Sequence, residues 1–490
     1  MIHNISAPLR GRSLLAATIS AVLVSSPAFA TNGMLMEGYG PESTGLGGAA
    51  TAFDNGAAGM ANNPATLGLM NDGESRLDIS IGNLRPSVAS TMTMMQGVPT
   101  ADSDADSFLM PAAGWVKKSG QYTYGVGVVS QGGMGAEYAK DTFLGAGTGV
   151  GARSELGIGA AIFPLAYEVN DRLSIGGSVD YVWGGLDLQM GLPIMNPDGQ
   201  GGIAPSPGSF ADFSQAFGGA QVLGEASGNL LGSLAPMIGG MTPAQMQGST
   251  AVFDFSNDND FTGQTSGSGT GAKVGMTYKV NPKLSVGASY RTKTNMSDFK
   301  GDGYMKLVDV ASGNALPNAN IPGEYRIKDF QFPDVATVGM AYQVSDQTML
   351  VADFSHINWS EVMKNFNLSF TVDSAVPGIG GQSANITLRQ HWDDQNVVKL
   401  GVAHQVNDRL TLRGGLNLAS NPVPDEYLNP LFPATIENHI TAGFTYGVHK
   451  NGAITGSLAV APEVKQTNSN TGIETTHSQT NFQLMYTHNF

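Results

Sequence analysis

The sequence contains no cysteine, which excludes disulfide bonds and thiolate chemistry. Charged residues make up only 13% of its 490 residues, about half of the fraction found in soluble proteins. Long apolar runs are also missing after Ala30, so no segment there can cross a bilayer as a helix. The 40 acidic residues outnumber the 25 basic ones, which argues against nucleic acid as a partner. These absences fit neither an ordinary soluble protein nor a helical membrane protein.

Residues 1–30 have the features of a secretory signal peptide. Arg10 and Arg12 precede an apolar run, and the triplet Ala-Phe-Ala at 28–30 is an A-x-A cleavage site. The run is too short for a transmembrane helix. We therefore expect an exported chain that is cleaved after Ala30.

Beyond residue 75 the chain has many glycines and short alternating segments. Glycine accounts for 65 residues, roughly twice its average usage. In the first segment Leu77, Ile79 and Ile81 alternate with polar residues or glycine. Such alternation is expected of strands with lipid on one face and a lumen on the other. Fourteen segments follow this pattern: 76–85, 107–116, 122–138, 152–169, 173–190, 269–280, 284–299, 324–344, 348–370, 384–406, 409–419, 439–448, 453–464 and 475–490.

The connections between these segments alternate in length. Six are short turns of Asn, Asp, Gly, Lys or Ser, and seven are longer loops. This is typical of transmembrane barrels, and an even strand number puts both termini on the short-turn, periplasmic side. The sequence thus predicts an all-β membrane protein, a 14-stranded antiparallel transmembrane β-barrel over residues 76–490. The final segment ends in an aromatic, Phe490, which resembles the C-terminal signal of outer-membrane barrels; the alternative is an ordinary alternating strand.

Residues 31–75 precede the first segment and have a different character. They are rich in Gly, Ala and Asn, and glycines interrupt their short apolar pieces, as in 45–50. Such a stretch would be a poor independent domain. It suits a compact irregular insert whose backbone groups are satisfied by surrounding walls.

Three motifs in this stretch resemble the N-terminal hatch of the FadL family. They are Ser-Thr-Gly-Leu-Gly-Gly-Ala at 43–49, Asp-Asn-Gly-Ala at 54–57 and Asn-Asn-Pro-Ala at 62–65. The family comprises bacterial outer-membrane transporters of long-chain fatty acids and other hydrophobic compounds, including the TodX-like aromatic-hydrocarbon importers. The resemblance implies a fourteen-stranded barrel plugged by this hatch, with Asn55, Asn63, Pro64 and Ala65 as its functional residues. It also implies a hydrophobic small molecule as ligand, with outer-membrane lipid, lipopolysaccharide and the barrel-assembly machinery as partners.

The third segment contains Gly132, Gly133 and Gly135, and glycines this close together break or bulge a strand. In the resembled family this strand is kinked inward and opens a lateral gap in the barrel wall. An apolar solute gains roughly 25 cal/mol per Å² on leaving water, so it needs a hole to the lipid and no water channel. The alternative is a glycine-rich strand in a glycine-rich protein.

The insert 191–266 is too long for a plain loop. Two sets of its apolar residues fall at helical spacing and predict short amphipathic helices. They are Phe210, Phe213 and Phe217, and Leu230, Leu231, Leu234 and Ile238. These helices either pack as a lid or form an outer apolar groove that first captures the ligand, as outer loops do in the resembled family.

Strand parity predicts which cations face the lumen. One face of 284–299 is apolar, so Arg291 and Lys293 point inward when that face meets lipid. Lys399 and Arg413 face inward by the same test. Each inward cation either contacts a ligand carboxylate or pairs with a lumenal Asp or Glu.

Catalytic motifs are missing from the sequence. The histidines have no metal-ligand spacing, and no nucleophile motif accompanies His391 with Asp393 or Asp394. We expect no catalytic residue, no metal and no cofactor, and uptake of hydrophobic compounds by facilitated diffusion. One alternative is a general diffusion porin, which would not need a buried N-terminal insert. A barrel enzyme or surface adhesin is the other, and long external β-repeats are not evident.

Overall fold

The computed structural model describes residues 32–490 except 95–96, 146–150, 195, 198–202, 205–208, 211–221, 243, 246–247, 258–262 and 313. The signal peptide expected at residues 1–30 lies outside the described residues.

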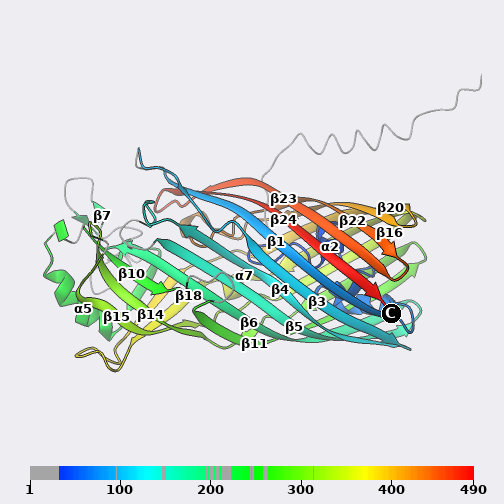
Figure 1. The fold of residues 1–490 in the computed structure, drawn as a ribbon, viewed down its shortest axis with the longest axis horizontal. Coiled ribbons are helices and arrows are strands. Elements are labelled where there is room, and N and C mark those ends of the chain that lie inside the picture. The colour runs from blue at the N-terminus through cyan, green and yellow to red at the C-terminus, as the bar shows by residue number, and fades with distance from the viewer. Residues whose placement is uncertain are drawn as a thin grey trace, which may run out of the picture.

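Most of the described chain forms one antiparallel sheet that closes on itself (Figure 1). The last strand pairs with the first from Arg76↔Asn489 to Met92↔Ile473, which leaves no free edge in the circuit. The fold is therefore an all-β closed antiparallel barrel. In order of pairing the circuit contains β1 (Ser75–Met92), β3 (Phe108–Ser119), β4 (Tyr122–Tyr138), β5 (Ala152–Asn170), β6 (Leu173–Pro193), β11 (Thr265–Asn281), β12 (Leu284–Arg291), β16 (Val335–Ser345), β17 (Thr348–Ile357), β20 (Gln395–Asn407), β21 (Leu410–Ala419), β22 (Asn438–His449), β23 (Gly452–Thr467) and β24 (Ile473–Asn489).

Further strands extend the sheet beyond the end of the barrel that lies opposite the C-terminus (Figure 1). β10 continues the sheet from β6 to β14, and β14 leads through β15, β18 and β19 to β9. The additional strands are β2 (Ala101–Asp102), β9 (Gly224–Ser227), β10 (Ser249–Phe255), β13 (Asn295–Met296), β14 (Phe299–Asp309), β15 (Asn314–Lys328), β18 (Asn365–Val372) and β19 (Ser383–Arg389), with β7 (Asn196–Pro197) and β8 (Ile203–Ala204) as a separate pair.

The described sheet contains 22 strands, whereas alternation predicts fourteen segments. Four predicted segments are in fact divided: 284–299 into β12, β13 and the start of β14, 324–344 into β15 and β16, 348–370 into β17 and β18, and 384–406 into β19 and β20. The last three breaks turn large aromatic side chains inward, and Phe332, Trp359 and Trp392 are buried there. Because these residues are apolar, the break resembles a continuing strand in the sequence.

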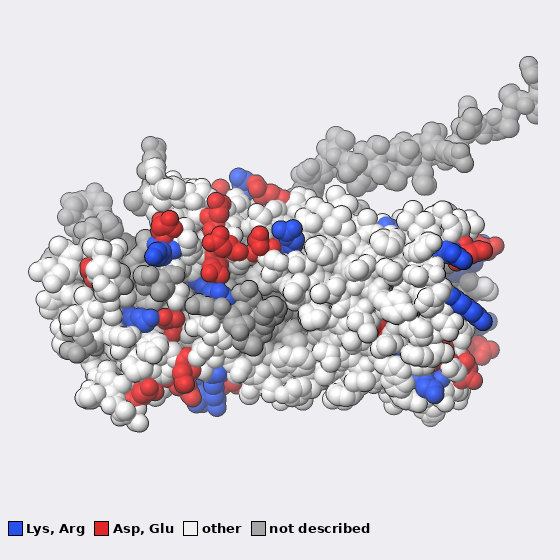
Figure 2. Space-filling view, in the orientation of Figure 1, with Lys and Arg blue, Asp and Glu red and all other residues white. Residues whose placement is uncertain are grey.

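Side chains alternate between the two faces of the wall. On β6, Val179 and Tyr181 are exposed, while Ser178, Asp180 and Val182 between them are buried. Figure 2 shows a broad band with very few Lys, Arg, Asp or Glu side chains, between the charges at the C-terminal end of the barrel and those over the other half. An apolar outer band with polar residues inside is the pattern of a barrel in lipid.

Helices are short and few among the described residues. None of them has both the length and the apolar character that crossing a membrane requires. They are α2 (Pro41–Thr44), α3 (Gly59–Asn62), α5 (Asn229–Gly239) and α7 (Trp359–Val362), with the 3₁₀ helices η1 (Gly56–Ala58), η2 (Pro64–Leu69) and η4 (Asp425–Tyr427).

Residues 32–73, here called the N-terminal segment, contact strands around the whole circuit. Four of its hydrogen bonds reach four different strands, β22, β17, β11 and β6. They are Gly47 N to Thr441 Oγ1 at 3.0 Å, Ala50 N to Asp353 Oδ2 at 2.8 Å, Asn63 Nδ2 to Met276 O at 3.2 Å and Ser174 Oγ to Ala65 O at 2.8 Å. The N-terminal segment is thus hydrogen-bonded to strands that lie well apart in the closed circuit.

Candidate functional site

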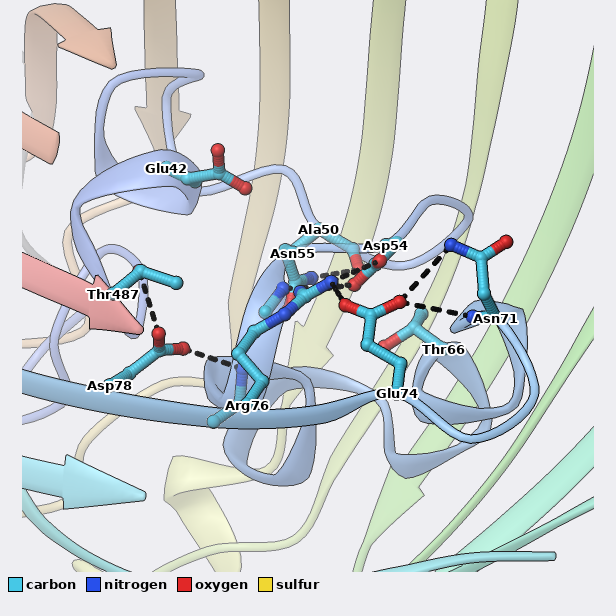
Figure 3. Close-up of polar contacts among 12 residues, drawn as sticks. Glu42, Ala50, Asp54, Asn55, Thr66, Asn71, Glu74, Arg76, Asp78 and Thr487 are labelled. Atoms are coloured by element: carbon cyan, nitrogen blue, oxygen red, sulfur yellow. Dashed lines mark hydrogen bonds and ion pairs between the residues drawn. The ribbon is translucent and has the colours of Figure 1, made fainter. Parts of the chain in front are cut away.

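Ion pairs tie the N-terminal segment to the start of β1 (Figure 3). Arg76 lies between two carboxylates, 3.0 Å from Asp54 and 2.7 Å from Glu74. Burial disfavours the charged form of Glu74, but the hydrogen bond and charge of Arg76 outweigh it, so the pKa of Glu74 lies below its ordinary value. Asp78 accepts a hydrogen bond from Ala57 N at 2.8 Å. These contacts fix the point where the chain passes from the lumen into the wall.

The four residues predicted for the hatch make contacts within this segment. Asn63 caps η2, since its Oδ1 accepts from Ala65 N at 3.1 Å, and its Nδ2 donates to Thr51 O at 2.8 Å. Pro64 occupies the first position of η2, where its missing N–H is not needed. Asn55 donates to a backbone carbonyl of the same segment. These contacts hold the segment in one compact shape.

Replacement of Asp353 by alanine is expected to loosen the N-terminal segment. Asp353 Oδ2 accepts from Ala50 N at 2.8 Å, Thr51 N at 3.1 Å and Thr51 Oγ1 at 2.6 Å. Alanine would leave these buried donors unpaired, and we expect the free energy of unfolding to fall by about 2 kcal/mol or more. Thermal unfolding followed by circular dichroism measures this. Asp353→Asn is the control and should cost less, because it keeps an acceptor oxygen; equal stability of Asp353→Ala and the wild type would contradict the prediction.

The hydrogen-bonded ladder between β3 and β4 stops halfway along the strands. Its last pair is Ala112↔Val129, although β4 continues to Tyr138. Just beyond that pair β4 has a β-bulge, because its register with β5 shifts between Ser130 and Gly132. The ladder between β3 and β4 is therefore interrupted beside the three glycines that the sequence singled out.

The N-terminal segment lies against the β4 edge that β3 leaves free. Gly133 N donates to Met34 O at 3.2 Å, and Tyr39 Oη donates to Gln131 O at 3.0 Å. Burial raises the pKa of Tyr39, so its phenol remains a donor. Gly132 has a φ of 153°, and a Cβ at this position would collide with the carbonyl oxygen of Met34. Glycine is thus required where the segment meets the bulge.

A cavity of about 650 Å³ lies beside this interruption of the ladder. Inside the barrel it is lined by Met34 and Leu35, which are buried. At its other end it is lined by Leu109, Val128 and Trp183, which are 48%, 45% and 38% exposed on the outer face of the wall. The lining of the cavity therefore combines buried residues of the N-terminal segment with residues that are exposed on the outer face of the wall.

A cluster of aromatic rings lies beside the inner end of this cavity. Met34 and Leu156 line both the cavity and a smaller void that also contacts Phe330, Phe366 and Phe432. The ring contacts continue through the breaks of the wall strands: Phe366–Phe432 at 5.8 Å, Phe330–Phe366 at 6.3 Å, Phe330–Phe332 at 6.0 Å, Phe332–Trp359 at 6.4 Å and Trp359–Trp392 at 5.3 Å. This cluster was not predicted from the sequence, in which Phe332, Trp359 and Trp392 fall inside segments that were predicted as continuous strands.

The predicted capture residues lie at the far end of the molecule, beyond the barrel wall (Figure 1). In α5, Leu230, Leu231 and Leu234 are buried rather than displayed. Phe210 is buried too and packs on Phe253 with ring centroids 6.2 Å apart. Phe213, Phe217 and the side chain of Ile238 lie outside the described residues.

The predicted inward cations are separated by the structure. Arg291 and Lys399 line a small pocket of about 80 Å³ together with Lys273. Lys293 lies beyond the end of β12, where it is 3.5 Å from Glu361 and exposed. Arg413 forms an ion pair with Glu42 of the N-terminal segment. Only Arg291 and Lys399 therefore share a pocket.

A closed antiparallel barrel with an apolar outer band is the architecture of transmembrane β-barrels. The sequence matches the profile of the family described as "Outer membrane protein transport protein (OMPP1/FadL/TodX)" over residues 17–489, and the chain belongs to this family. It is accordingly a β-barrel of the outer membrane, and the family and its structural neighbours are transport channels rather than enzymes.

Two similar solved structures are toluene transporters. TodX of P. putida is 26% identical with a TM-score of 0.75, and TbuX of Ralstonia pickettii is 27% identical with a TM-score of 0.70; each comparison covers 93% of this chain and 99% of the other. An uncharacterized protein of Chlorobium limicola, from the 5′ region of the phosphoenolpyruvate carboxykinase gene, is 41% identical over 81 residues, 16% of this chain and 40% of that protein. The chain spans about two fifths of the length of the curated relatives it matches.

Proposed function

We propose that this protein takes up hydrophobic compounds by facilitated diffusion, along a route that ends in the side of the barrel. The cavity of about 650 Å³ beside the interrupted β3–β4 ladder carries this proposal. An apolar solute in that cavity is in contact with both the lumen and the lipid-facing surface. It gains roughly 25 cal/mol per Å² of apolar area by entering the lipid, which is sufficient to direct it sideways. Long-chain fatty acids and aromatic hydrocarbons are the candidate substrate classes.

In this proposal the strands of the closed circuit, fourteen in number, form the membrane-spanning wall of residues 76–490. Residues 31–75 form a hatch within it, which the hydrogen bonds to β6, β11, β17 and β22 support. The short turns lie at the end where β1 begins, which we assign to the periplasm. The insert 191–266 then lies outside the cell, and lipid, lipopolysaccharide and the barrel-assembly machinery are the partners that this location implies.

Transport would proceed in four steps. The outer insert captures the solute, and because the α5 leucines are buried, this step requires α5 to move from its packed position. The solute then passes along the aromatic cluster to the cavity beside Met34. A shift of the hatch around 63–65 widens the path, and the solute leaves between β3 and β4 past 132–135. The direction of flow follows the concentration gradient.

Sugar permeation and hydrophobic uptake together test this function against the porin alternative. Liposomes that contain the protein should swell slowly in arabinose, because the N-terminal segment fills the lumen. Cells that express the protein should accumulate radiolabelled toluene or dodecanoate faster than cells with an empty vector. Rapid swelling without any gain in uptake would contradict the importer function and support a general diffusion porin.

A further inference from the structure

The lining of the large cavity includes two buried hydrogen-bond acceptors, Glu37 and His477, here called the polar wall. Glu37 is 0% exposed, and neither carboxylate oxygen has a hydrogen-bond partner among the described residues. His477 is also buried, and its Nε2 has no partner in the same part of the chain. Glu155, Asp187 and Gln479 line the cavity as well, whereas Met34, Leu35 and Leu156 give it its apolar surface.

The hydrogen bond at Nδ1 of His477 determines whether Nε2 is a hydrogen-bond donor or an acceptor. Nδ1 lies 2.8 Å from the carbonyl oxygen of Pro433, which can only accept. Nδ1 therefore carries the hydrogen and donates it. In the neutral imidazole this leaves Nε2 with a lone pair, so it is an acceptor. The polar wall thus combines a carboxylate and an imidazole acceptor, both unpaired.

The cations nearest to Glu37 do not occupy its oxygens. Arg291, Lys273 and Lys399 line the small pocket on which Glu37 also borders, and no hydrogen bond joins any of the three to Glu37 in the described structure. The charge of Lys399 interacts with that of Glu37 without a hydrogen bond. The pocket of about 80 Å³ has room for a few water molecules but is far below the roughly 300–1,000 Å³ of a typical small-molecule site. A ligand can therefore meet Glu37 only from the large cavity.

We propose that the large cavity selects an apolar molecule that carries a hydroxyl group, an alcohol or a phenol, and that Glu37 accepts the hydrogen of that hydroxyl. His477 Nε2 is the second acceptor at the polar wall. The apolar part of the ligand lies along Met34, Leu35 and Leu156 toward the interrupted β3–β4 ladder. A ligand carboxylate would bring a second negative charge to Glu37 and no donor, and a plain hydrocarbon would leave both acceptors unpaired. This inference rests on the proposed uptake function and names its substrate class.

Three probes of equal chain length test the selectivity: 1-dodecanol, dodecanoate and dodecane. Purified full-length protein in lipid nanodiscs is loaded with tritiated 1-dodecanol, and each unlabelled probe competes for it, with empty nanodiscs as background. We expect 1-dodecanol to compete at roughly tenfold lower concentration than dodecanoate or dodecane, since one hydrogen bond to a buried charged acceptor is worth about that factor. Dodecanoate that competes as well as 1-dodecanol in the wild type would overturn the inference without any variant.

Two substitutions assign the selectivity to the polar wall. Glu37→Gln keeps the size, removes the charge and adds an N–H donor, so dodecanoate should gain affinity and 1-dodecanol should lose its advantage over it. His477→Phe keeps a ring, removes the acceptor and should weaken 1-dodecanol alone. Asp72→Asn, an exposed carboxylate of the same N-terminal segment, is the control and should change nothing. An unchanged preference for 1-dodecanol over dodecanoate in a folded Glu37→Gln protein would also overturn the inference.

The outcomes separate this inference from the proposed function. Equal binding of 1-dodecanol and dodecane, with uptake intact, would reject the hydroxyl preference and leave hydrophobic uptake standing. Binding of none of the three probes above empty nanodiscs, with no uptake by cells, would reject both.

Discussion

Deletion of Gln131 is expected to close the barrel wall and to reduce hydrophobic uptake to the level of cells that lack the protein. Gln131 is the additional residue of the β4 bulge, because Ser130 pairs with Gly159 and Gly132 already pairs with Ile158. Without it, every later pair between β4 and β5 is kept while the bulge is lost. A straightened β4 can then pair with the start of β3 at 108–111, which is paired with β1 but not with β4, and the solute loses its exit into the lipid.

The matched control for this deletion is Gln131→Ala. The alanine keeps the extra backbone residue, and with it the bulge and the carbonyl that Tyr39 donates to. Uptake of a radiolabelled hydrophobic probe should therefore stay at the wild-type level. Circular dichroism verifies that both variants retain their strand content. Undiminished uptake by a folded deletion variant would show that the solute leaves by another path.

Substitution of Gly48 by alanine is expected to displace the N-terminal segment and to open the lumen to ions. Gly48 has a φ of 88°, and a Cβ there would collide with the backbone carbonyl of Glu37. The strained backbone and the steric overlap together cost roughly 2–6 kcal/mol. Backbone atoms on both sides of the contact cannot give way as a flexible side chain would. We expect a lower thermal stability and a clear rise in conductance across planar bilayers.

Gly73→Ala is the control that separates the effect of backbone strain from that of steric overlap. Gly73 has a similar φ of 80°, but nothing lies within 4 Å of its added Cβ. It should therefore cost only about 1 kcal/mol of backbone strain and leave the conductance low. Equal conductance of the two variants would mean that the N-terminal segment does not seal the lumen through the Gly48–Glu37 contact.

The barrel could be predicted from the sequence because its cause is local. Strand parity has a period of two residues, so the alternation of Ile79 and Ile81 with polar neighbours is visible without any tertiary contact. Both side chains are indeed about half exposed on the outer face, at 53% and 50%. The glycines at 132–135 were found in the same way, since a strand with three glycines is locally weak.

The breaks within the predicted strands could not be predicted from the alternation of apolar and polar residues. Phe332, Trp359 and Trp392 sit in short breaks between strands, where the chain turns inward to bury them. An aromatic residue is compatible both with the lipid-facing side of a strand and with a buried position inside the barrel. Alternation therefore could not distinguish a strand that continues outward from one that stops and folds inside.

The sequence by itself determined that the wall is made of alternating strands and that β4 contains a weak point. Only the tertiary structure decided which residues line the cavity beside that weak point. Glu37 comes from the beginning of the chain and His477 from its last strand, and barrel closure through the β1–β24 ladder brings both to one cavity. No periodicity links two such residues, because their proximity depends on the closed circuit of hydrogen bonds and on the segment that it encloses.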